Sequence, residues 1–247
     1  MPFPTTEVLD QILIAYDEID HDLTIFMDGI RKWFDDHKRL RQPHSSVVHS
    51  VKSRLKDRNH LKDKVCRKWD HSDPITPENI FEKITDLAGV RVLHLYQDQF
   101  PKIHAEILDK VERQKDWVLV EPPKAYTWDP ETRQFFEDLK VGVEIKESYY
   151  TSVHYVVRPR LDSPLCCEIQ VRTLFEEIWG EVDHALNYPN PSMNLACREQ
   201  LKVLAKLVGA GSRLVDSIFR SAETGGELHE IRGSASGDEG SDGRNER

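Results

Sequence analysis

Three short segments of the sequence bring together side chains that could bind a ligand or take part in catalysis. The segment "CCEIQVRT" alternates strictly between apolar and polar residues, which predicts a β-strand with one face in the core. Its other face carries a carboxylate, an amide and a guanidinium, from Glu168, Gln170 and Arg172. Such a row could be a surface ion ladder, or it could be the floor of a site.

The other two segments also place polar residues at or near strands. In "KITDLAGVRVLHL", Asp86 comes just before a strand, and Arg91 lies on or near the polar face of that strand. In "VEIKESYYTSVHYVV", Lys146 precedes a strand, while Tyr150 and His154 share one face because they are four residues apart. Each residue alone has an ordinary explanation, since an aspartate before a strand is often a turn residue and a lone histidine is often structural.

Basic residues are concentrated in one part of an otherwise acidic chain. The 247 residues carry a net charge of −9, which argues against a protein that coats nucleic acid through bulk positive charge. Between Lys52 and Lys68, however, there are eight basic residues and two acidic ones. This segment fits either a solvated basic helix or a binding site for a local anionic ligand.

Taken together, these residues predict a site for phosphoryl-type transfer. Asp86 and Glu168, on separate strands, could hold Mg²⁺, which prefers oxygen ligands and shares substrate phosphates. Nearby lysines and arginines could bind a polyphosphate, and an exposed tyrosine could stack on a base. The sequence contains neither G-x-x-x-x-G-K-[ST] nor G-x-G-x-x-G, so it matches neither a P-loop nor a Rossmann protein.

The hydrophobic periodicity predicts alternating helices and strands, and therefore an α/β (α+β) fold with a mixed sheet of about five strands flanked by helices. Strands are expected over 47–56, 89–96, 117–121, 150–158 and 166–172. Helices are expected over 5–40, 57–69, 98–113, 129–139 and 195–220, and another begins with Thr76 as N-cap and Pro77. A further helix follows the last strand, with a capping box from Thr173 to Glu176 and one apolar stripe: Phe175, Ile178, Val182 and Leu186.

These elements suggest four consecutive parts of the chain: an N-terminal helical segment over 1–44, a central domain over 45–190, a C-terminal helix over 191–221 and a tail over 222–247. The tail is rich in Gly, Ser and charge, which predicts disorder. Because no secretory signal and no run of 18 or more apolar residues occurs, we expect no membrane partner. The four cysteines form neither a disulfide nor a zinc pattern, so a reducing cytoplasm is the expected location.

Four motifs resemble the synthetase domain of RelA/SpoT-type alarmone synthetases, in order and spacing, over roughly residues 45–190: "VKSRLKDRNHLKDKV", "DLAGVRV", "KESYYTSVH" and "EIQVRTLFEEIWGEVDHALNY". The long first helix and the helix after residue 195 are similar to those that flank this domain in small alarmone synthetases. The resemblance implies a monofunctional, nucleotidyltransferase-like synthetase fold. The family's histidine–aspartate hydrolase domain has no counterpart, because His21–Asp22 is a lone pair in the first helix.

The resemblance implies a GTP diphosphokinase that transfers the β,γ-pyrophosphate of ATP to the ribose 3′-hydroxyl of GDP or GTP and releases AMP. It implies that Asp86 and Glu168 bind Mg²⁺ and that Glu168 takes the proton of the attacking hydroxyl. On the donor side it implies an adenine sandwich and a set of phosphate-binding lysines: Arg54 and Arg91, then Lys56, Lys62 and Lys64.

On the acceptor side, the resemblance implies that Tyr150 stacks on the guanine base. It implies that Lys146 and His154 contact the acceptor's phosphates. Gln170 and Arg172 would then order the floor of the site. The apolar face of their strand would be core and its polar face catalytic.

Two positions depart from the family pattern, both on the acceptor side. Many relatives have Gly immediately before the stacking tyrosine, whereas this chain has Tyr149, so we expect that loop to be less permissive. Small synthetases often have Asn where this chain has Glu177, and an acid there would change which base edges can be recognised. The departures keep open an alternative activity, pyrophosphorylation of the 3′ end of tRNA.

A different class of function is a catalytically inactive nucleotide-binding module. The presence of Asp86, Glu168 and the lysines argues against it. In either case the terminal helices could join copies of the chain into a homo-oligomer.

Overall fold

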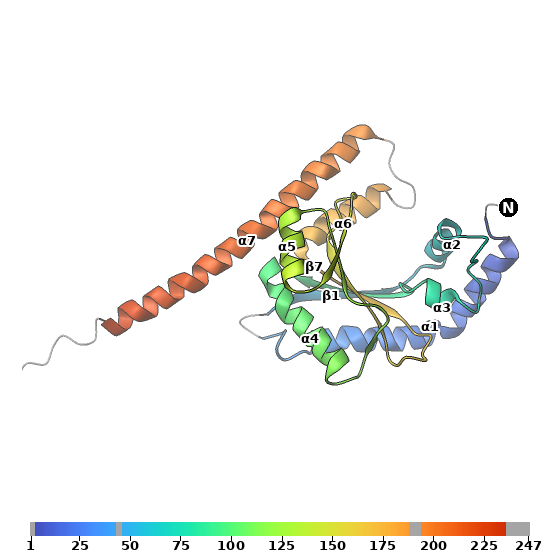
Figure 1. Ribbon diagram of the computed structural model, residues 1–247, viewed down its shortest axis with the longest axis horizontal. Helices are drawn as coiled ribbons and strands as arrows, with labels where there is room; N and C mark the ends of the chain where they lie inside the picture. Colours follow the sequence, from blue (N-terminus) through green and yellow to red (C-terminus); the bar gives the residue numbers. More distant parts are fainter. Residues whose placement is uncertain (1–2, 43–45, 188–193, 236–247) are drawn as a thin grey trace, which may run out of the picture.

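Seven strands form one mixed sheet in the computed structural model, which describes residues 3–42, 46–187 and 194–235 (Figure 1). Six of them lie in the order β1-β2-β7-β6-β4-β5, and β3 pairs with β6 outside this path. The strands are β1 (Val48–Leu55), β2 (Ala88–His94), β3 (Val118–Leu119), β4 (Lys124–Thr127), β5 (Gly142–Ile145), β6 (Ser152–Arg158) and β7 (Cys167–Thr173). The mixed α/β architecture predicted from the sequence is confirmed.

Helices cover both faces of this sheet. They are α1 (Thr6–Asp35), α2 (Arg58–Arg67), α3 (Ile80–Lys83), α4 (Phe100–Glu112), α5 (Pro130–Asp138), α6 (Leu174–Asn187) and α7 (Leu195–Ala235), with a short 3-10 helix, η1 (Gln97–Gln99). In Figure 1, α1 and α4 lie below the sheet, α6 lies above it, and α7 packs on α6 and extends well beyond the sheet. None of the helices in the described part of the chain is both long and apolar enough to cross a bilayer.

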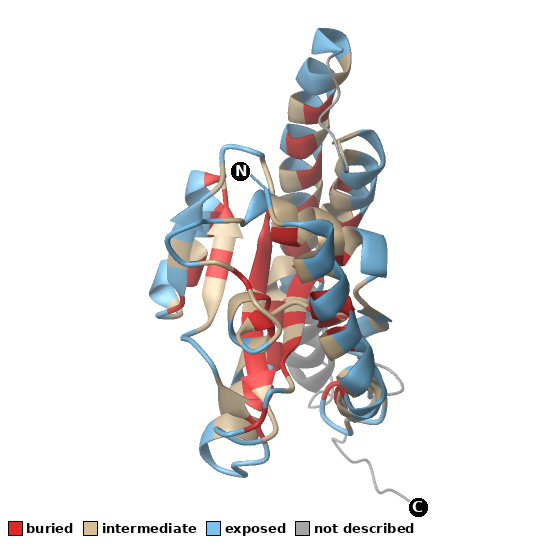
Figure 2. Ribbon diagram, turned by 90° about the vertical axis from the view of Figure 1, so that its right-hand side faces the viewer, coloured by how far each residue is buried: buried red, intermediate tan, exposed pale blue. Residues whose placement is uncertain are grey.

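The main core lies between the sheet and α1. Burial follows the strands and the inward sides of the helices, as Figure 2 shows. Large side chains such as Phe34, Leu23 and Tyr155 are almost completely buried there. A second, smaller apolar cluster lies between α6 and α7 around Trp179, Ala205 and Val208.

Strand β7 behaves as its alternation predicts. Cys167, Ile169 and Val171 are buried, while Glu168 and Gln170 are only partly buried on the opposite face. The strand is central, because it pairs with β2 in parallel and with β6 in antiparallel orientation. The capping box that follows is also confirmed: the Thr173 N–H donates to Glu176 Oε2 (2.7 Å), and the Glu176 N–H donates to Thr173 Oγ1 (3.2 Å).

Several local predictions are wrong. Strands β4 and β5, of four residues each, were not predicted, although Val143 and Ile145 of β5 alternate with Gly142 and Glu144. Thr76 does not cap a helix that begins at Pro77. Instead, the Asn79 side chain accepts a hydrogen bond from the Thr76 N–H (2.8 Å), and α3 is a single turn that begins at Ile80.

The apolar stripe predicted for α6 is largely exposed, with Ile178 at 55 % and Leu186 at 41 %. The buried side of α6 is instead set by Trp179, whose indole N–H donates to the Leu201 carbonyl (3.1 Å). Helix α7, predicted to end near residue 220, continues to Ala235, so the first part of the expected tail is helical. Composition alone could not show that an established helix would propagate. The remaining tail, 236–247, lies outside the described residues.

Candidate functional site

A cavity of about 610 Å³ lies over one edge of the sheet, between β1, β2 and β7 and the helices α2 and α6. This volume is in the usual range for small-molecule sites. Most of the polar residues singled out in the sequence line it, together with others. The lining residues are Lys52, Ser53, Arg54, Lys56, Asp57, His60, Lys64, Arg67, Lys68, Asp86, Gly89, Val90, Arg91, Glu168, Gln170 and His184.

Strand register brings the floor of this cavity together from three neighbouring strands. Lys52 of β1 is opposite Arg91 of β2, which is opposite Gln170 of β7. One row further along the strands, Gly89 lies between Arg54 and Glu168. A Cβ atom at Gly89 would lie 3.9 Å from the backbone oxygens of Arg54 and Glu168, so an alanine would fit the protein itself. The glycine therefore leaves open space above the floor rather than relieving a clash.

Asp86 lies just before β2 and is held by two lysines. Lys56 Nζ donates to its Oδ2 (2.8 Å), and Lys64 Nζ lies 2.6 Å from the same oxygen. The other oxygen, Oδ1, is buried and has no hydrogen-bond partner within the described residues. Burial raises the pKa of Asp86, but the charges of Lys64 and Lys56 outweigh this effect and lower the pKa below its usual value. The carboxylate is therefore ionised and has one free oxygen.

Glu168 is the second carboxylate in the cavity, and both its oxygens are engaged. His154 Nδ1–H donates to Oε1 (2.9 Å), and the Gln170 amide donates to Oε2 (2.5 Å). Burial raises the pKa of Glu168, but the contacts with His154 and Gln170 lower it, and the net shift is downward. The charge of Asp86 opposes that shift, as expected for two carboxylates that line the same cavity.

These two carboxylates fit a divalent cation that is shared with a phosphate ligand. Among the described residues there is no group of three or more His, Cys, Asp or Glu that could hold a metal. Mg²⁺ is commonly bound by one or two carboxylates, with water and substrate phosphates completing its octahedral shell. The free, buried Oδ1 of Asp86 is the kind of oxygen that such an ion would use.

Gln170 is the acceptor-side candidate that lines the cavity, whereas Lys146, Tyr150, His154 and Arg172 form a second group beside it. The hydroxyl of Tyr150 lies 2.9 Å from His154 Nε2, and its ring is 6.4 Å from that of Tyr126. Tyr126 also lies edge-on to His154 at 4.8 Å, and Lys146 Nζ lies 4.5 Å from its ring centroid. Arg172, only 3 % exposed, lies beneath Tyr150 with its guanidinium carbon 5.8 Å from the ring centroid.

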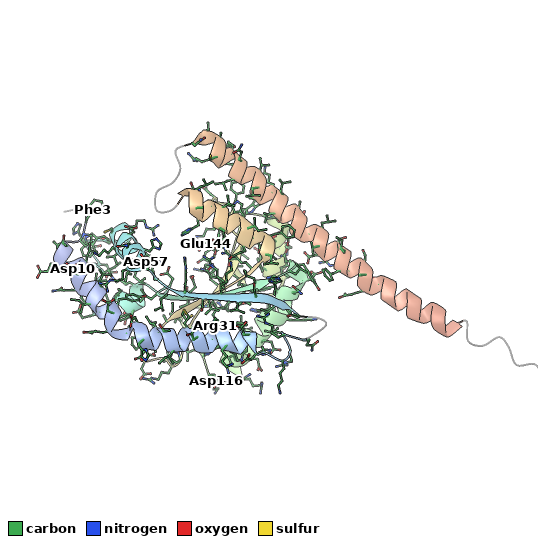
Figure 3. All side chains as sticks on the ribbon, turned by 180° about the vertical axis from the view of Figure 1, so that it is seen from behind. Phe3, Asp10, Arg31, Asp57, Asp116 and Glu144 are labelled. Atoms are coloured by element: carbon green, nitrogen blue, oxygen red, sulfur yellow. The ribbon has the colours of Figure 1, made fainter. Side chains whose placement is uncertain are left out.

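Lys62 is the donor-side candidate that the structure does not bring into the cavity. Its Nζ lies 4.0 Å from Asp10 of α1, and its side chain is 41 % exposed. Asp10 and Asp57, at the start of α2, lie at the same end of the molecule (Figure 3). Lys64 points the other way, into the cavity.

Several lining residues were not identified as site residues from the sequence. Lys52, Arg67 and Lys68 belong to the basic segment between Lys52 and Lys68. The sequence did not show which residues of that segment line a cavity and which point into solvent. His60 of α2 and His184 of α6 approach each other across the cavity, with ring centroids 6.4 Å apart. No sequence signal connected them, because they are far apart along the chain.

The two departures from the family pattern have clear structural outcomes. Tyr149 has a φ of 66°, the left-handed region that favours glycine. The loop therefore keeps this conformation with a tyrosine in it, and the ring packs near Trp128 (5.0 Å) and the α6–α7 cluster. Glu177 is buried and forms ion pairs with Lys52 and Arg91 as well as with Arg172.

Comparison with known proteins gives one matching family and several similar structures. Residues 53–193 match the model described as "Region found in RelA / SpoT proteins". The GTP pyrophosphokinase YjbM of Bacillus subtilis is 26 % identical over 231 residues, which covers 90 % of this chain and 91 % of that protein.

Two crystal structures of small alarmone synthetase 1 from Bacillus subtilis are also similar, one bound to its product pppGpp and one bound to AMPCPP. Their TM-scores are 0.57 and 0.56, at 24 % and 22 % identity, and each comparison covers 87 % of this chain and 97 % of that one. These structural matches support the fold described above.

Proposed function

Since the chain belongs to the RelA/SpoT family, we propose that it is a pyrophosphokinase that moves the β,γ-pyrophosphate of ATP to the ribose 3′-hydroxyl of GDP or GTP and releases AMP. The observation that carries this proposal is the joint placement of Asp86 and Glu168 with Lys56 and Lys64 in one cavity. Two ionised carboxylates and a set of cations suit the binding of a metal–polyphosphate. The name of the relative YjbM agrees with this activity. We take residues 45–190 to be the catalytic unit.

The donor would occupy the cavity. Arg54 of β1 and Arg91 of β2, on neighbouring strands of the sheet, would flank the adenine. Lys56 and Lys64, which now form ion pairs with Asp86, would contact the donor's phosphates instead. Each lysine would thereby replace one charge-assisted contact with another. A bound Mg²⁺ would neutralise charge that develops on the transferred group.

The acceptor would lie beside Tyr150, with its 3′-hydroxyl directed to Glu168. Tyr150 would stack on the guanine, and Lys146, next to Tyr126, would contact the acceptor's phosphates. Glu168 would accept the hydroxyl proton as that oxygen attacks the β-phosphorus of ATP. His154 and Gln170 would hold the carboxylate in place, since each already donates to one of its oxygens.

The test is incubation with ATP labelled in the γ-phosphate and Mg²⁺, in parallel with GDP, GTP and deacylated tRNA. We expect label in the guanosine nucleotide and an equal amount of AMP. Label in tRNA alone would favour the tRNA-modifying alternative. Nucleotide binding without any transfer would instead favour the inactive binding module.

We also propose that copies of the chain associate through α7. Exposed apolar residues recur along this helix at steps of four, three and four, the spacing of a coiled-coil seam: Val203, Leu207, Ala210 and Leu214. Leu207 and Leu214 are 64 % and 62 % exposed in the single chain. Light scattering should show an oligomer for the wild type and a smaller species for Leu207→Glu/Leu214→Glu. A wild-type monomer would refute this assembly.

The reaction would take place in the cytoplasm. All four cysteines lie within the described ranges, and none of them is in a disulfide. This agrees with a reducing compartment.

A further inference from the structure

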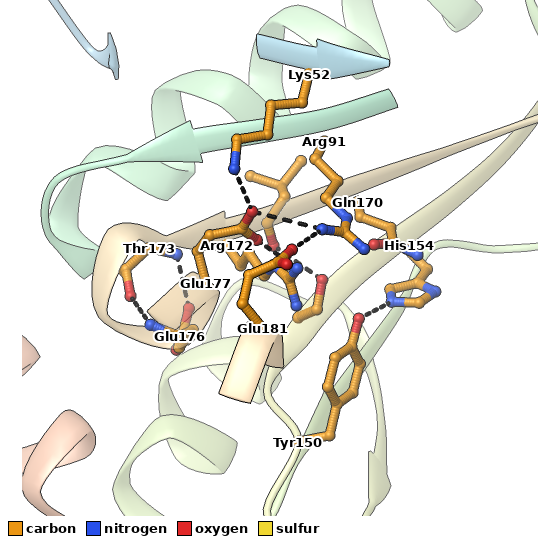
Figure 4. A network of polar contacts seen from close by, with 12 residues as sticks. Lys52, Arg91, Tyr150, His154, Gln170, Arg172, Thr173, Glu176, Glu177 and Glu181 are labelled. Atoms are coloured by element: carbon orange, nitrogen blue, oxygen red, sulfur yellow. Dashed lines mark hydrogen bonds and ion pairs between the residues drawn. The ribbon is translucent and has the colours of Figure 1, made fainter. Parts of the chain in front are cut away.

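Glu177 is a buried carboxylate that contacts cations from three strands. Its side chain is 7 % exposed, and Figure 4 shows it at the centre of a polar network. Lys52 Nζ of β1 lies 2.9 Å from Oε1, and Arg91 Nη1 of β2 lies 3.4 Å from the same oxygen. Arg172 of β7 forms an ion pair with Oε2. Burial raises the pKa of Glu177, but these cations outweigh that effect and lower it, so the group is ionised.

The sheet forces these three cations to lie close together. Lys52 is opposite Arg91, which is opposite Gln170, and Arg172 lies two residues beyond Gln170 on the same face. Like charges in neighbouring cross-strand positions destabilise a sheet. Glu177 supplies the counter-charge that the three share.

Arg91 and Arg172 depend on Glu177 to different degrees. Arg91 also pairs with Glu181, one turn further along α6, at 2.5 Å, and Glu181 is 56 % exposed. For Arg172, Glu177 is the ion-pair partner that the described part of the chain provides. A Cβ atom at Gly180 would lie 2.7 Å from Arg172 Nη1, so α6 rests directly on this guanidinium.

The two arginines belong to different halves of the site. Arg91 lines the donor cavity, whereas Arg172 lies beneath the ring of Tyr150 on the acceptor side. We infer that Glu177 is a positioning residue that fixes Arg91 and Arg172 together and so keeps the donor and acceptor subsites in register. This inference rests on the proposed function for the identity of the two subsites.

The same contacts argue against direct recognition of a base by Glu177. A carboxylate can recognise the Watson–Crick edge of guanine by accepting from its N1–H and 2-amino groups. Both oxygens of Glu177 already contact cations, and its side chain is almost fully buried. Glu177 is therefore placed to hold cations and not to recognise a base edge.

The test compares Glu177→Asp with the matched control Glu181→Gln, which removes a carboxylate one turn away on the same helix. Glu177→Asp keeps the negative charge beside Arg172 and should therefore fold. Because the aspartate side chain is one methylene shorter, its carboxylate lies further from the three cations. Displacements of about 1 Å at positioned groups can cost on the order of 100-fold in rate. We expect kcat/KM to fall by about 10- to 100-fold, with raised KM for both ATP and GDP, while Glu181→Gln stays within about threefold of wild type.

A purely structural role would give a different pattern, because a smaller folded fraction lowers kcat and leaves both KM values unchanged. A direct base contact would raise the KM of the acceptor alone and reduce the preference for GDP over IDP, which lacks the 2-amino group. Either pattern would overturn the inference. Unchanged KM values for both substrates in Glu177→Asp would overturn it as well.

Calorimetric titration separates this inference from the proposed function, because binding can be measured without turnover. Wild type and Glu177→Asp would each be titrated with α,β-methylene ATP and with GDP. Weaker binding of both nucleotides by the variant would support the positioning role of Glu177, whether or not the wild type transfers pyrophosphate. Absence of transfer by the wild type would refute only the proposed function. Equal binding by the two proteins would overturn the positioning role.

Discussion

The hydroxyl of Tyr150 lies 2.9 Å from Nε2 of His154, and Nδ1 of the same imidazole lies 2.9 Å from Oε1 of Glu168. Because an ionised carboxylate can only accept, the Nδ1–H donates to Glu168. In a neutral imidazole, Nε2 then accepts from the tyrosine hydroxyl. The imidazole of His154 thus links Tyr150, which is proposed to stack on the acceptor's base, to Glu168, which is proposed to take the proton of the acceptor's 3′-hydroxyl.

This link predicts that Tyr150→Phe has a measurable cost. The phenylalanine keeps the ring but removes the hydrogen bond to His154, and such a bond is worth about 0.5–1.5 kcal/mol. We expect a fall in kcat/KM of roughly 2- to 10-fold. Tyr150→Ala also loses stacking worth about 1–3 kcal/mol and should raise the KM of the acceptor further. Steady-state kinetics with GDP varied would test this order, and a fully active Phe variant would show that the link to His154 is dispensable.

Glu168→Gln should fold normally and lose almost all transfer activity. The two side chains have nearly equal volume, but the amide cannot take the proton and is a poorer ligand for Mg²⁺. Removal of a general base typically costs about 10²- to 10⁴-fold. Asp86→Asn should also be impaired, and added Mg²⁺ should partly restore it, whereas Glu168→Gln should not respond.

AMP release measured against Mg²⁺ concentration tests both variants, after circular dichroism has confirmed that each is folded. A folded Glu168→Gln protein that retains more than about a tenth of wild-type activity would rule out Glu168 as the base.

Lys64→Ala should impair the use of ATP, and Lys62→Ala serves as its matched control. Lys64 lines the cavity beside Asp86, whereas Lys62 lies near Asp10. Loss of a charge-assisted contact costs about 1.5–3 kcal/mol, so the KM for ATP should rise by about 10- to 100-fold in Lys64→Ala. The Lys62 variant should stay within about threefold. Equal defects in the two variants would contradict the orientation of α2 described above.

Glu176 should make the stability of the fold depend on pH. Its carboxyl faces a small internal cavity of about 20 Å³ between α6 and α7, and burial raises its pKa to about 7. The folded state then binds the proton more tightly than the unfolded state, where the pKa is about 4.5. Protonation of Glu176 therefore stabilises the folded state, and this stabilisation is complete below about pH 4.5 and is lost as the pH rises through about 7. The loss amounts to at most roughly 3 kcal/mol of the free energy of unfolding.

Urea unfolding of wild type and Glu176→Gln at pH 5 and pH 8 measures this effect. Because the amide does not titrate, the variant should lose less stability than the wild type between the two pH values. Equal losses in the two proteins would show that Glu176 does not cause the pH dependence.

The left-handed conformation of Tyr149 predicts an unusual order of stability. Tyr149→Gly and Tyr149→Ala both lose the packing against Trp128 and should be less stable than wild type. A non-glycine residue in this region costs about 1–2 kcal/mol, so the Gly variant should be more stable than the Ala variant by about 1 kcal/mol. Urea unfolding would show this order. If Ala proved the more stable, φ at this position would not be constrained as the structure shows.

Local patterns in the sequence were enough to predict much of the fold. The alternation of β7 and the capping box from Thr173 to Glu176 depend on residues that are close along the chain, and both are confirmed. The same alternation placed Glu168 and Gln170 on one polar face. Strand β5, at the edge of the sheet, also alternates but has only four residues, and it was missed because so short a pattern also occurs in loops.

What the sequence determined by itself was the set of chemical groups and the side of each element on which they lie. Lys62 and Lys64, two residues apart on a helix, must point to nearly opposite sides. Only the packing of Leu61 and Val65 into the core decided that Lys64, and not Lys62, points into the cavity. Likewise, the sequence shows Glu177 on a helix, but its contact with Lys52, Arg91 and Arg172 required three strands to be paired in one register beneath α6. Contacts between distant segments depend on that packing, which no local pattern encodes.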